Sequence, residues 1–301
     1  MVDKMIVVIG SIALDTTRTP KRTVKEVLGG SGTYFSIAAS FFNQIGLVGI
    51  IGSDFPNKYL KALDKRADLS GVQVKRGKTF RYDSSFDLSL NKRTTIKTEL
   101  NVFENFEPKV PNKYRSAEYV YLGNIDPEQQ LKVLEQMYKP KLVVSDTIEL
   151  WIKTKPERVK EVISKMNGIL INDEEIKLLC GVSNIIKCSK IVLDWGVDFI
   201  IVKKGEHGAI LCTQKMIFPS PAYPLDNVID STGAGDSFAG GFMGHIARNG
   251  MYDEKILREA VIYGNVMGSF AIEDYGVKRL LSLTGEEIEG RFQKYKQMIK
   301  I

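Results

Sequence analysis

The chain has 301 residues, of which 44% are hydrophobic and 26% are charged, and its formal net charge is +6. These values are ordinary for a soluble globular protein. Its lysines and arginines are scattered over predicted helix faces without a basic stripe and stacking aromatic residues, so no nucleic-acid partner is expected. No run of about 18 apolar residues and no signal-peptide pattern occurs, which predicts a cytoplasmic protein with no membrane partner.

Three cysteines occur without the paired Cys or Cys/His spacing of a zinc site, and they predict free thiols: Cys180, Cys188 and Cys212. Short apolar runs bounded by Gly, Asn or Asp alternate with helical patterns. The runs are residues 5–9, 47–51, 119–122, 142–144, 168–171 and 199–202. The helical patterns are residues 32–42, 127–138, 156–166, 174–180, 257–270 and 284–300. This alternation predicts an α/β fold with a mostly parallel sheet, and the absence of repeats or linkers favours one domain over residues 1–301.

Two segments depart from this alternation of strands and helices, residues 14–27 and 79–102, because polar and apolar positions alternate in them. The second contains a turn signal at Asn91-Lys92-Arg93, which suits antiparallel strands with one wet face. We expect a small β-sheet with strands in about 12–27 and 78–103, acting as a lid over the end of the main sheet where α/β proteins bind ligands. Open edges of such a sheet would allow a homodimer through the lid.

The most informative segment is Asp230-Ser231-Thr232-Gly233-Ala234-Gly235-Asp236, which runs into an apolar helical pattern. Small residues at a helix N-terminus leave backbone N–H groups bare, and these groups hold anions. The carboxylate of Asp236 would repel a resting phosphate, so it is better explained as the acceptor of a proton from a hydroxyl that attacks the phosphate. Local chemistry alone leaves open a plain Gly-rich turn with an acid near a helix start.

Further candidates follow the first predicted strand. Asp15 comes just after that strand, where a carboxylate could hold the hydroxyls of a substrate. Gly29 and Gly30 precede the next predicted helix, and because they have no side chains a substrate could approach their backbone closely. A Gly-Gly turn is also a common structural feature. No Gly-x-Gly-x-x-Gly follows the first strand, which excludes a Rossmann dehydrogenase.

The order of Gly-Ser-Ile-Ala-Leu-Asp, Gly-Gly-Ser-Gly-Thr, Asn-Asp-Glu-Glu and Asp-Ser-Thr-Gly-Ala-Gly-Asp resembles the ribokinase-like, or PfkB, family of carbohydrate kinases. The resemblance covers about residues 5–283. It implies a three-layer α/β/α sandwich with a β-sheet lid. It also implies transfer of the γ-phosphoryl group of ATP to a hydroxyl of a small sugar, polyol or nucleoside.

The resemblance also assigns roles to the motif residues. Asp236 resembles the family's catalytic base, and the N–H groups of Gly233, Ala234 and Gly235 resemble its anion hole. Asn172 and Glu175 stand at the Asn-x-x-Glu spacing that the family uses to organise Mg²⁺. The same two residues also suit a capping box at a helix start, and both roles can hold together.

Several residues resemble the family's nucleotide site. Residues 203–209, Lys-Lys-Gly-Glu-His-Gly-Ala, resemble the family's Lys-x-Gly-x-x-Gly turn beside ATP, which is also a hairpin between two strands. In that resemblance Gly205 and Gly208 allow close approach, and Lys204 lies near phosphate. Thr232, in the long motif, and Asn265, at a position that borders the adenine pocket, complete the predicted nucleotide contacts.

A monovalent cation is a further possible cofactor, since activation by such ions is common in the family. Asp230 is the candidate ligand. Asp274 stands where ribokinases carry a basic residue, which leaves ion dependence open. A non-catalytic nucleotide or metabolite sensor on the same fold is the alternative function, although a sensor has no need of Asp236.

The substrate side departs from the family pattern. Tyr34 stands where ribokinases place an Asn that binds sugar hydroxyls, so plain ribose is not the favoured substrate. Asp15 is the main candidate for binding substrate hydroxyls, and Asn124 is a second. Three aromatic residues of the predicted lid could stack on a base or a sugar, or could pack the small sheet: Phe80, Tyr82 and Phe86.

Overall fold

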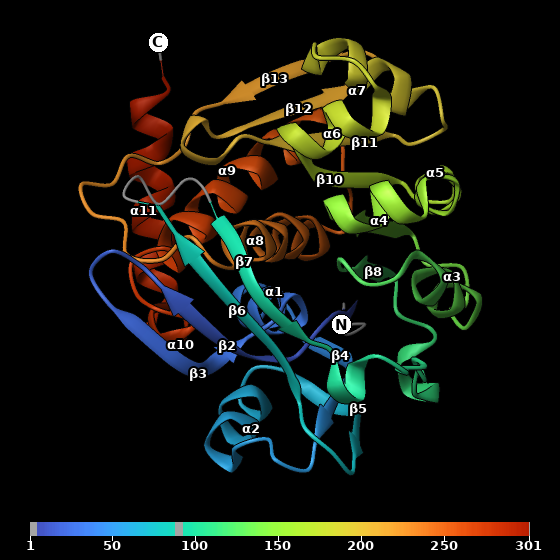
Figure 1. Ribbon diagram of the computed structural model, residues 1–301. Helices are drawn as coiled ribbons and strands as arrows, with labels where there is room; N and C mark the ends of the chain where they lie inside the picture. Colours follow the sequence, from blue (N-terminus) through green and yellow to red (C-terminus); the bar gives the residue numbers. More distant parts are fainter. Residues whose placement is uncertain (1–4, 88–92, 301) are drawn as a thin grey trace.

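The structure is a computed structural model that describes residues 5–87 and 93–300. Within these ranges, nine strands form a sheet in the order β13-β12-β11-β10-β9-β8-β1-β4-β5 (Figure 1). Its strands are β1 (Ile6–Ile9), β4 (Ile45–Gly52), β5 (Asp68–Lys75), β8 (Tyr119–Leu122), β9 (Leu142–Asp146), β10 (Gly168–Asn172), β11 (Phe199–Lys203), β12 (Ala209–Thr213) and β13 (Ile217–Ser220). All neighbouring pairs from β11 to β5 are parallel, and β12 and β13 pair antiparallel at one edge. The predicted mostly parallel sheet is therefore confirmed.

Helices cover both faces of this sheet. The α-helices are α1 (Ser31–Ala39), α2 (Asn57–Asp64), α3 (Pro127–Glu135), α4 (Glu149–Thr154), α5 (Pro156–Ser164), α6 (Asp173–Cys180), α7 (Ile185–Leu193), α8 (Ala234–Asn249), α9 (Glu254–Ala271), α10 (Lys278–Ser282) and α11 (Gly285–Met298). Short 3-10 helices are η1 (Asn101–Phe103), η2 (Asn112–Tyr114) and η3 (Gly205–His207). None of the helices in the described ranges is long and apolar enough to cross a bilayer.

Successive side chains of a strand point to opposite faces of the sheet, so the core has one layer on each face. Val8 packs in the cluster that includes α1, α8 and α9, whereas its neighbour Val7 packs in the cluster with α3 and α5. Further along the sheet, Ile169 and Ile171 of β10 face a third cluster with α4 to α7. Because both faces are buried, the strands show as continuous apolar runs in the sequence. The predicted three-layer α/β/α sandwich is confirmed.

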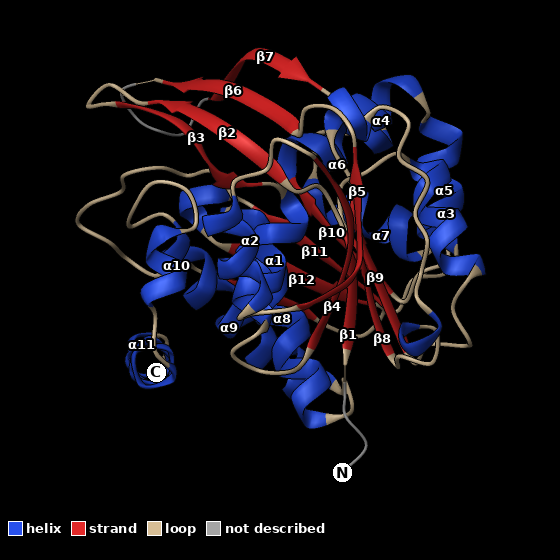
Figure 2. Ribbon diagram, turned by 90° about the horizontal axis from the view of Figure 1, so that it is seen from below, coloured by secondary structure: helices blue, strands red, loops and turns tan. Residues whose placement is uncertain are grey.

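A second, smaller sheet joins β2 (Ala13–Arg18), β3 (Thr23–Gly29), β6 (Phe80–Phe86) and β7 (Arg93–Glu99) in the order β3-β2-β6-β7. Figure 2 shows it on the side of the molecule opposite the N-terminus. The β2-β3 and β6-β7 pairs are antiparallel as predicted, but β2 and β6 are parallel. Both strands leave the carboxyl edge of the main sheet, after β1 and β5 respectively, and therefore run in the same direction.

The predicted turn signal falls partly outside the described residues, since Asn91 and Lys92 belong to the segment 88–92. The edges of the small sheet are β3 and β7, the strands that a second copy would pair with. Its roles as a lid and as a dimer contact stay predictions.

Helix α8 lies between α1 and α9, and glycines allow the close approach. A Cβ atom added to Gly240 would lie 2.7 Å from both the Ala38 Cβ and the Phe35 carbonyl oxygen of α1. On the neighbouring side, a Cβ atom on Gly241 would lie 2.6 Å from the Tyr263 carbonyl oxygen of α9. The adjacent glycines of the apolar run therefore set how deeply α8 packs.

The packing predicts opposite effects for two helical glycines. Gly240→Ala should lower the free energy of unfolding by about 1–3 kcal/mol, because its methyl group would overlap main-chain atoms that cannot move independently. Gly290 lies on the exposed face of α11, where an added Cβ atom meets no atom within 4 Å. Gly290→Ala should therefore raise the free energy of unfolding by about 0.5–1 kcal/mol. Urea denaturation of the two variants checks this. Equal stabilities would contradict the packing described for α8.

Candidate active site

The candidate site lies at the carboxyl edge of the main sheet. Residues that end or follow neighbouring parallel strands meet there: Asn124 after β8, Asp146 at the end of β9, Asn172 at the end of β10 and Lys203 at the end of β11. The N-terminus of α8 reaches the same edge, because Lys203 Nζ would lie 3.2 Å from a Cβ atom added to Gly235.

Gly233 caps helix α8 in a conformation that other residues adopt at a cost. Its φ is 75°, in the left-handed region, and a Cβ atom there would lie 2.3 Å from the ring of Tyr34. The helix begins at Ala234, and Asp236 lies in its first turn. The N–H groups of this turn have no acceptor within the helix, although that of Ala234 donates to the Ser231 carbonyl oxygen just before it at 3.4 Å. Helix N-termini of this kind bind anions.

Tyr34 is buried beside the acids of the site. It is only 1% exposed, and its hydroxyl has no hydrogen-bond partner among the described residues. Burial raises the pKa of Tyr34 well above its ordinary value of 10.0, and the negative charges of Asp230, Asp15 and Asp236 raise it further. The structure thus brings together the predicted base, the predicted substrate carboxylate and the aromatic residue that replaces the family's Asn.

Tyr34 also makes stability depend on pH. Above about pH 10 the unfolded chain loses the phenol proton while folded Tyr34 keeps it, so the folded state loses stability as the pH rises. Tyr34→Phe should lose stability less steeply than the wild type, by up to about 1.4 kcal/mol per pH unit for the one proton. Denaturation at pH 9 to 11 measures the difference. Parallel curves for the two proteins would contradict this account of Tyr34.

Asp15 and Gly29 meet across the β2-β3 pair. A Cβ atom on Gly29 would lie 1.9 Å from an Asp15 carboxylate oxygen, so glycine is required for the carboxylate to take this place. Gly30, with φ 95°, caps α1. Next to it, Ser11 and Ser31 exchange backbone-to-hydroxyl hydrogen bonds of 3.0 and 3.2 Å. These contacts fix the turn that carries the predicted substrate residues.

An ion pair that was not expected from the sequence lies at the centre of the edge. Lys203 donates to Asp146 Oδ2 at 2.7 Å, and Tyr121 donates to the same oxygen at 3.2 Å. Burial lowers the pKa of Lys203, but the charges of Asp146, Glu175 and Asp236 outweigh it and raise the pKa overall. Lys203 and Asp146 each end a buried strand, and Lys203 also begins the Lys-x-Gly-x-x-Gly turn, but neither signal predicts that the two side chains pair.

Asn172 and Glu175 form the predicted capping box of α6. The Asn172 side chain accepts from Glu175 N at 2.7 Å, and Glu175 accepts from Asn172 N at 3.0 Å. No cluster of three or more His, Cys, Asp or Glu that could hold a metal occurs among residues 5–87 and 93–300. Mg²⁺ is satisfied by one or two protein oxygens together with phosphate and water, so this donor pair fits an ion that arrives with a nucleotide.

The predicted nucleotide residues occupy two places. Gly205 and Gly208, with φ of 54° and 82°, shape the turn between β11 and β12, and Lys204 N donates to the Gly208 carbonyl at 2.7 Å. The hairpin is therefore real. Asn265 is buried in α9 and donates to the Ser220 hydroxyl at 3.0 Å, so its amide is part of a structural network. Binding of ATP by these residues stays a prediction.

Asp230, the first acid of the motif at residues 230–236, holds the motif in place through hydrogen bonds. Asp230 is 1% exposed and accepts from Thr232 N at 2.9 Å and from Gly276 N at 3.5 Å, so it links the motif to the loop after α9. The hydroxyl of Thr232 is buried without a partner among the described residues. A cation at Asp230 stays a prediction.

The aromatic residues of the small sheet are divided between packing and exposure. Phe80 stacks on Phe103 with ring centroids 5.3 Å apart, which supports the packing role. Tyr82 is partly exposed, and its hydroxyl hydrogen-bonds that of Thr95 at 2.8 Å.

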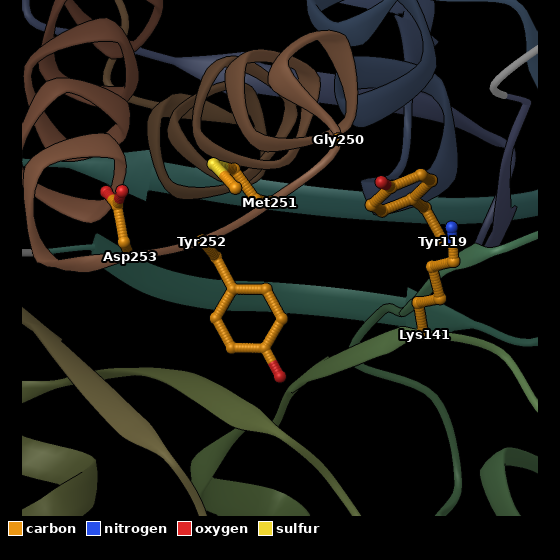
Figure 3. Close-up of a pocket in the computed structure, with 6 residues that line it drawn as sticks. All are labelled: Tyr119, Lys141, Gly250, Met251, Tyr252 and Asp253. Atoms are coloured by element: carbon orange, nitrogen blue, oxygen red, sulfur yellow. The ribbon is translucent and has the colours of Figure 1, made fainter.

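A hollow of about 350 Å³ lies at the opposite end of the sheet. Figure 3 shows Tyr119 and Lys141, at the amino ends of β8 and β9, facing Met251 and Tyr252 after α8. None of the residues predicted for the site lines it. We therefore place the candidate site by the groups that converge at the carboxyl edge and not by this hollow.

Comparison with known proteins identifies the family. Residues 3–282 match the model of the pfkB family carbohydrate kinases. The chain belongs to this family. A cytidine kinase of Thermococcus kodakarensis is 29% identical to this PfkB-family chain over 262 residues, which cover 83% of this chain and 91% of the relative.

Solved structures of similar fold include the Methanocaldococcus jannaschii nucleoside kinase, a ribokinase-family member. It is 24% identical, with a TM-score of 0.77, and the match covers 97% of this chain and 98% of that one. A Burkholderia thailandensis nucleoside kinase in complex with inosine is 21% identical, with a TM-score of 0.79, covering 96% and 97%. At these identities the two structures support the fold alone.

The chain is thus a ribokinase-family sugar or nucleoside kinase, a phosphotransferase with an alcohol group as acceptor. Kinases of this family use ATP. The alternative of a non-catalytic sensor loses its support, because the relatives are kinases.

Proposed function

We propose that this chain transfers the γ-phosphoryl group of ATP to a hydroxyl of a small nucleoside, with Asp236 as the base. The observation that carries the proposal is the placement of Asp236 in the first turn of α8, close enough to Tyr34, Tyr121 and Lys203 to act on the pKa of each. A carboxylate and N–H groups without an acceptor inside the helix stand together at the start of α8, and a hydroxyl attack on phosphorus needs both components.

The transfer breaks one bond and forms another. The acceptor oxygen attacks the γ-phosphorus while the bond to the β-phosphate oxygen breaks, and ADP leaves. Asp236 takes the hydroxyl proton. The N–H groups at Gly233, Ala234 and Gly235 stabilise the charge on the transferred group, because donors fixed in place need no reorganisation.

Asn172 and Glu175 would hold the Mg²⁺ that accompanies ATP, an ion that neutralises phosphate charge. Lys204, Gly205 and Gly208 would border the nucleotide. The turn after β11 lies at the same edge of the sheet as Asn172 and Lys203.

A nucleoside is favoured over a simple sugar by two observations. Tyr34 offers a buried aromatic ring and an unpartnered hydroxyl in place of an Asn. One relative, which matches 83% of this chain, is named a cytidine kinase. Asp15 would accept hydrogen bonds from the ribose hydroxyls, and Asn124 lies at the same edge.

The role of Asp236 is tested by Asp236→Asn. Loss of the base should lower kcat by about 10²–10⁴ with little change in the KM for ATP, since Asn cannot take the proton. The matched control is Asp194→Asn, at the C-terminal end of α7. Product formation is followed by chromatography of ATP reactions with cytidine, other nucleosides, sugars and polyols. Full turnover by Asp236→Asn would contradict the mechanism.

The substrate assignment is tested by Asp15→Asn. Loss of the charge-assisted hydrogen bonds should raise the KM for the nucleoside by about tenfold or more, while the KM for ATP stays close to wild type. A wild-type enzyme that phosphorylates sugars and no nucleoside would contradict the nucleoside proposal. It would leave the role of Asp236 intact.

A further inference from the structure

We propose that the Lys203 ammonium, held by Asp146, binds the transferred phosphoryl group beside the N-terminus of α8. This inference rests on the proposed function, because it requires phosphoryl transfer at that helix. It gives a catalytic role to Lys203, the first residue of the turn that resembles the Lys-x-Gly-x-x-Gly pattern.

The backbone places Lys203 between the two halves of the site. As the last residue of β11, it pairs in register with Asn172, which caps α6. On the other side, its Nζ would lie 3.2 Å from a Cβ atom added to Gly235. The glycine therefore leaves room for the ammonium directly beside the backbone of the anion hole.

The partner of Lys203 is fully engaged and rigid. Asp146 is 4% exposed, and it also accepts from Thr147 N at 2.8 Å and from the Tyr121 hydroxyl at 3.2 Å. Tyr121 in turn stacks on Phe35 of α1, with ring centroids 4.2 Å apart. An ammonium has three donors, so Lys203 can bond Asp146 and still offer N–H groups to an incoming oxygen.

The charges of the site call for a cation at this point. Three acids at this edge are buried, Asp15, Asp146 and Asp230, and Asp236 lies in the first turn of α8. A nucleotide with several negative charges must approach these carboxylates. Lys203 places a positive charge where the phosphoryl oxygens would lie, and its side chain keeps 17% exposure. Its role is electrostatic, since it stays protonated and forms no bond to phosphorus.

Lys215 provides the control, because it is an exposed lysine in the turn between β12 and β13, at the opposite end of the sheet from Lys203. Lys203→Met should lower kcat by about 10²–10³, as removal of one fixed donor typically does, while Lys215→Met should stay close to wild type. Steady-state kinetics with ATP and the accepted alcohol measures both.

Lys203→Met also leaves Asp146 buried without its cation, which could unfold the site. The double variant Lys203→Met/Asp146→Asn removes both charges and should recover the melting temperature without recovering kcat. Recovery of wild-type kcat in the double variant would show that the pair is only structural, and would overturn the proposal.

A second readout needs no alcohol. Calorimetry compares binding of MgADP with and without fluoroaluminate, which mimics the phosphoryl group in transfer. The wild type and Lys215→Met should bind MgADP more tightly with fluoroaluminate, and Lys203→Met should lose this gain. A gain kept by Lys203→Met, or absent from the wild type, would overturn the inference. A gain in a wild type that phosphorylates no alcohol would instead overturn the proposed function.

Discussion

The contact between Gly233 and the ring of Tyr34 ties the site together. One residue starts the helix that carries Asp236, and the other lies in the helix that follows the Gly29-Gly30 turn. The chain has to enter α8 in a left-handed conformation with no side chain, or the ring cannot occupy its place. The predicted phosphoryl side and the predicted alcohol side are therefore joined by direct packing between α1 and α8, which Gly240 extends along the helices.

Electrostatics determines what this packed edge can do. The acids Asp15, Asp146, Asp230 and Asp236 gather where parallel strands end, and the partly exposed Lys203 lies among them with a raised pKa. The proposed transfer needs a proton acceptor, an anion hole and a cation within a small volume, and Asp236, the start of α8 and Lys203 lie together at this edge. Burial, together with the charges of Asp230, Asp15 and Asp236, raises the pKa of Tyr34 well above its ordinary value.

The sequence predicts the local parts of the site and misses the parts that need topology. The motif around Gly233 and Asp236 can be recognised in the sequence because consecutive residues form the start of α8. The Asn172–Glu175 capping box is legible for the same reason. The Lys203–Asp146 pair is not, because its members are 57 residues apart on β11 and β9, with β10 between them. β5 is also missed, since an edge strand with partly exposed residues gives no apolar run.

The central claim is that an alcohol is attacked from the carboxyl edge, with its oxygen at Asp236 and the phosphoryl group at the N-terminus of α8. A crystal structure with MgADP, fluoroaluminate and the alcohol substrate measures this directly. The account predicts fluoroaluminate within hydrogen-bond distance of the N–H groups at Gly233 to Gly235, and the acceptor oxygen within hydrogen-bond distance of the Asp236 carboxylate. An acceptor oxygen that lies against any other base, or fluoroaluminate away from α8, would contradict it.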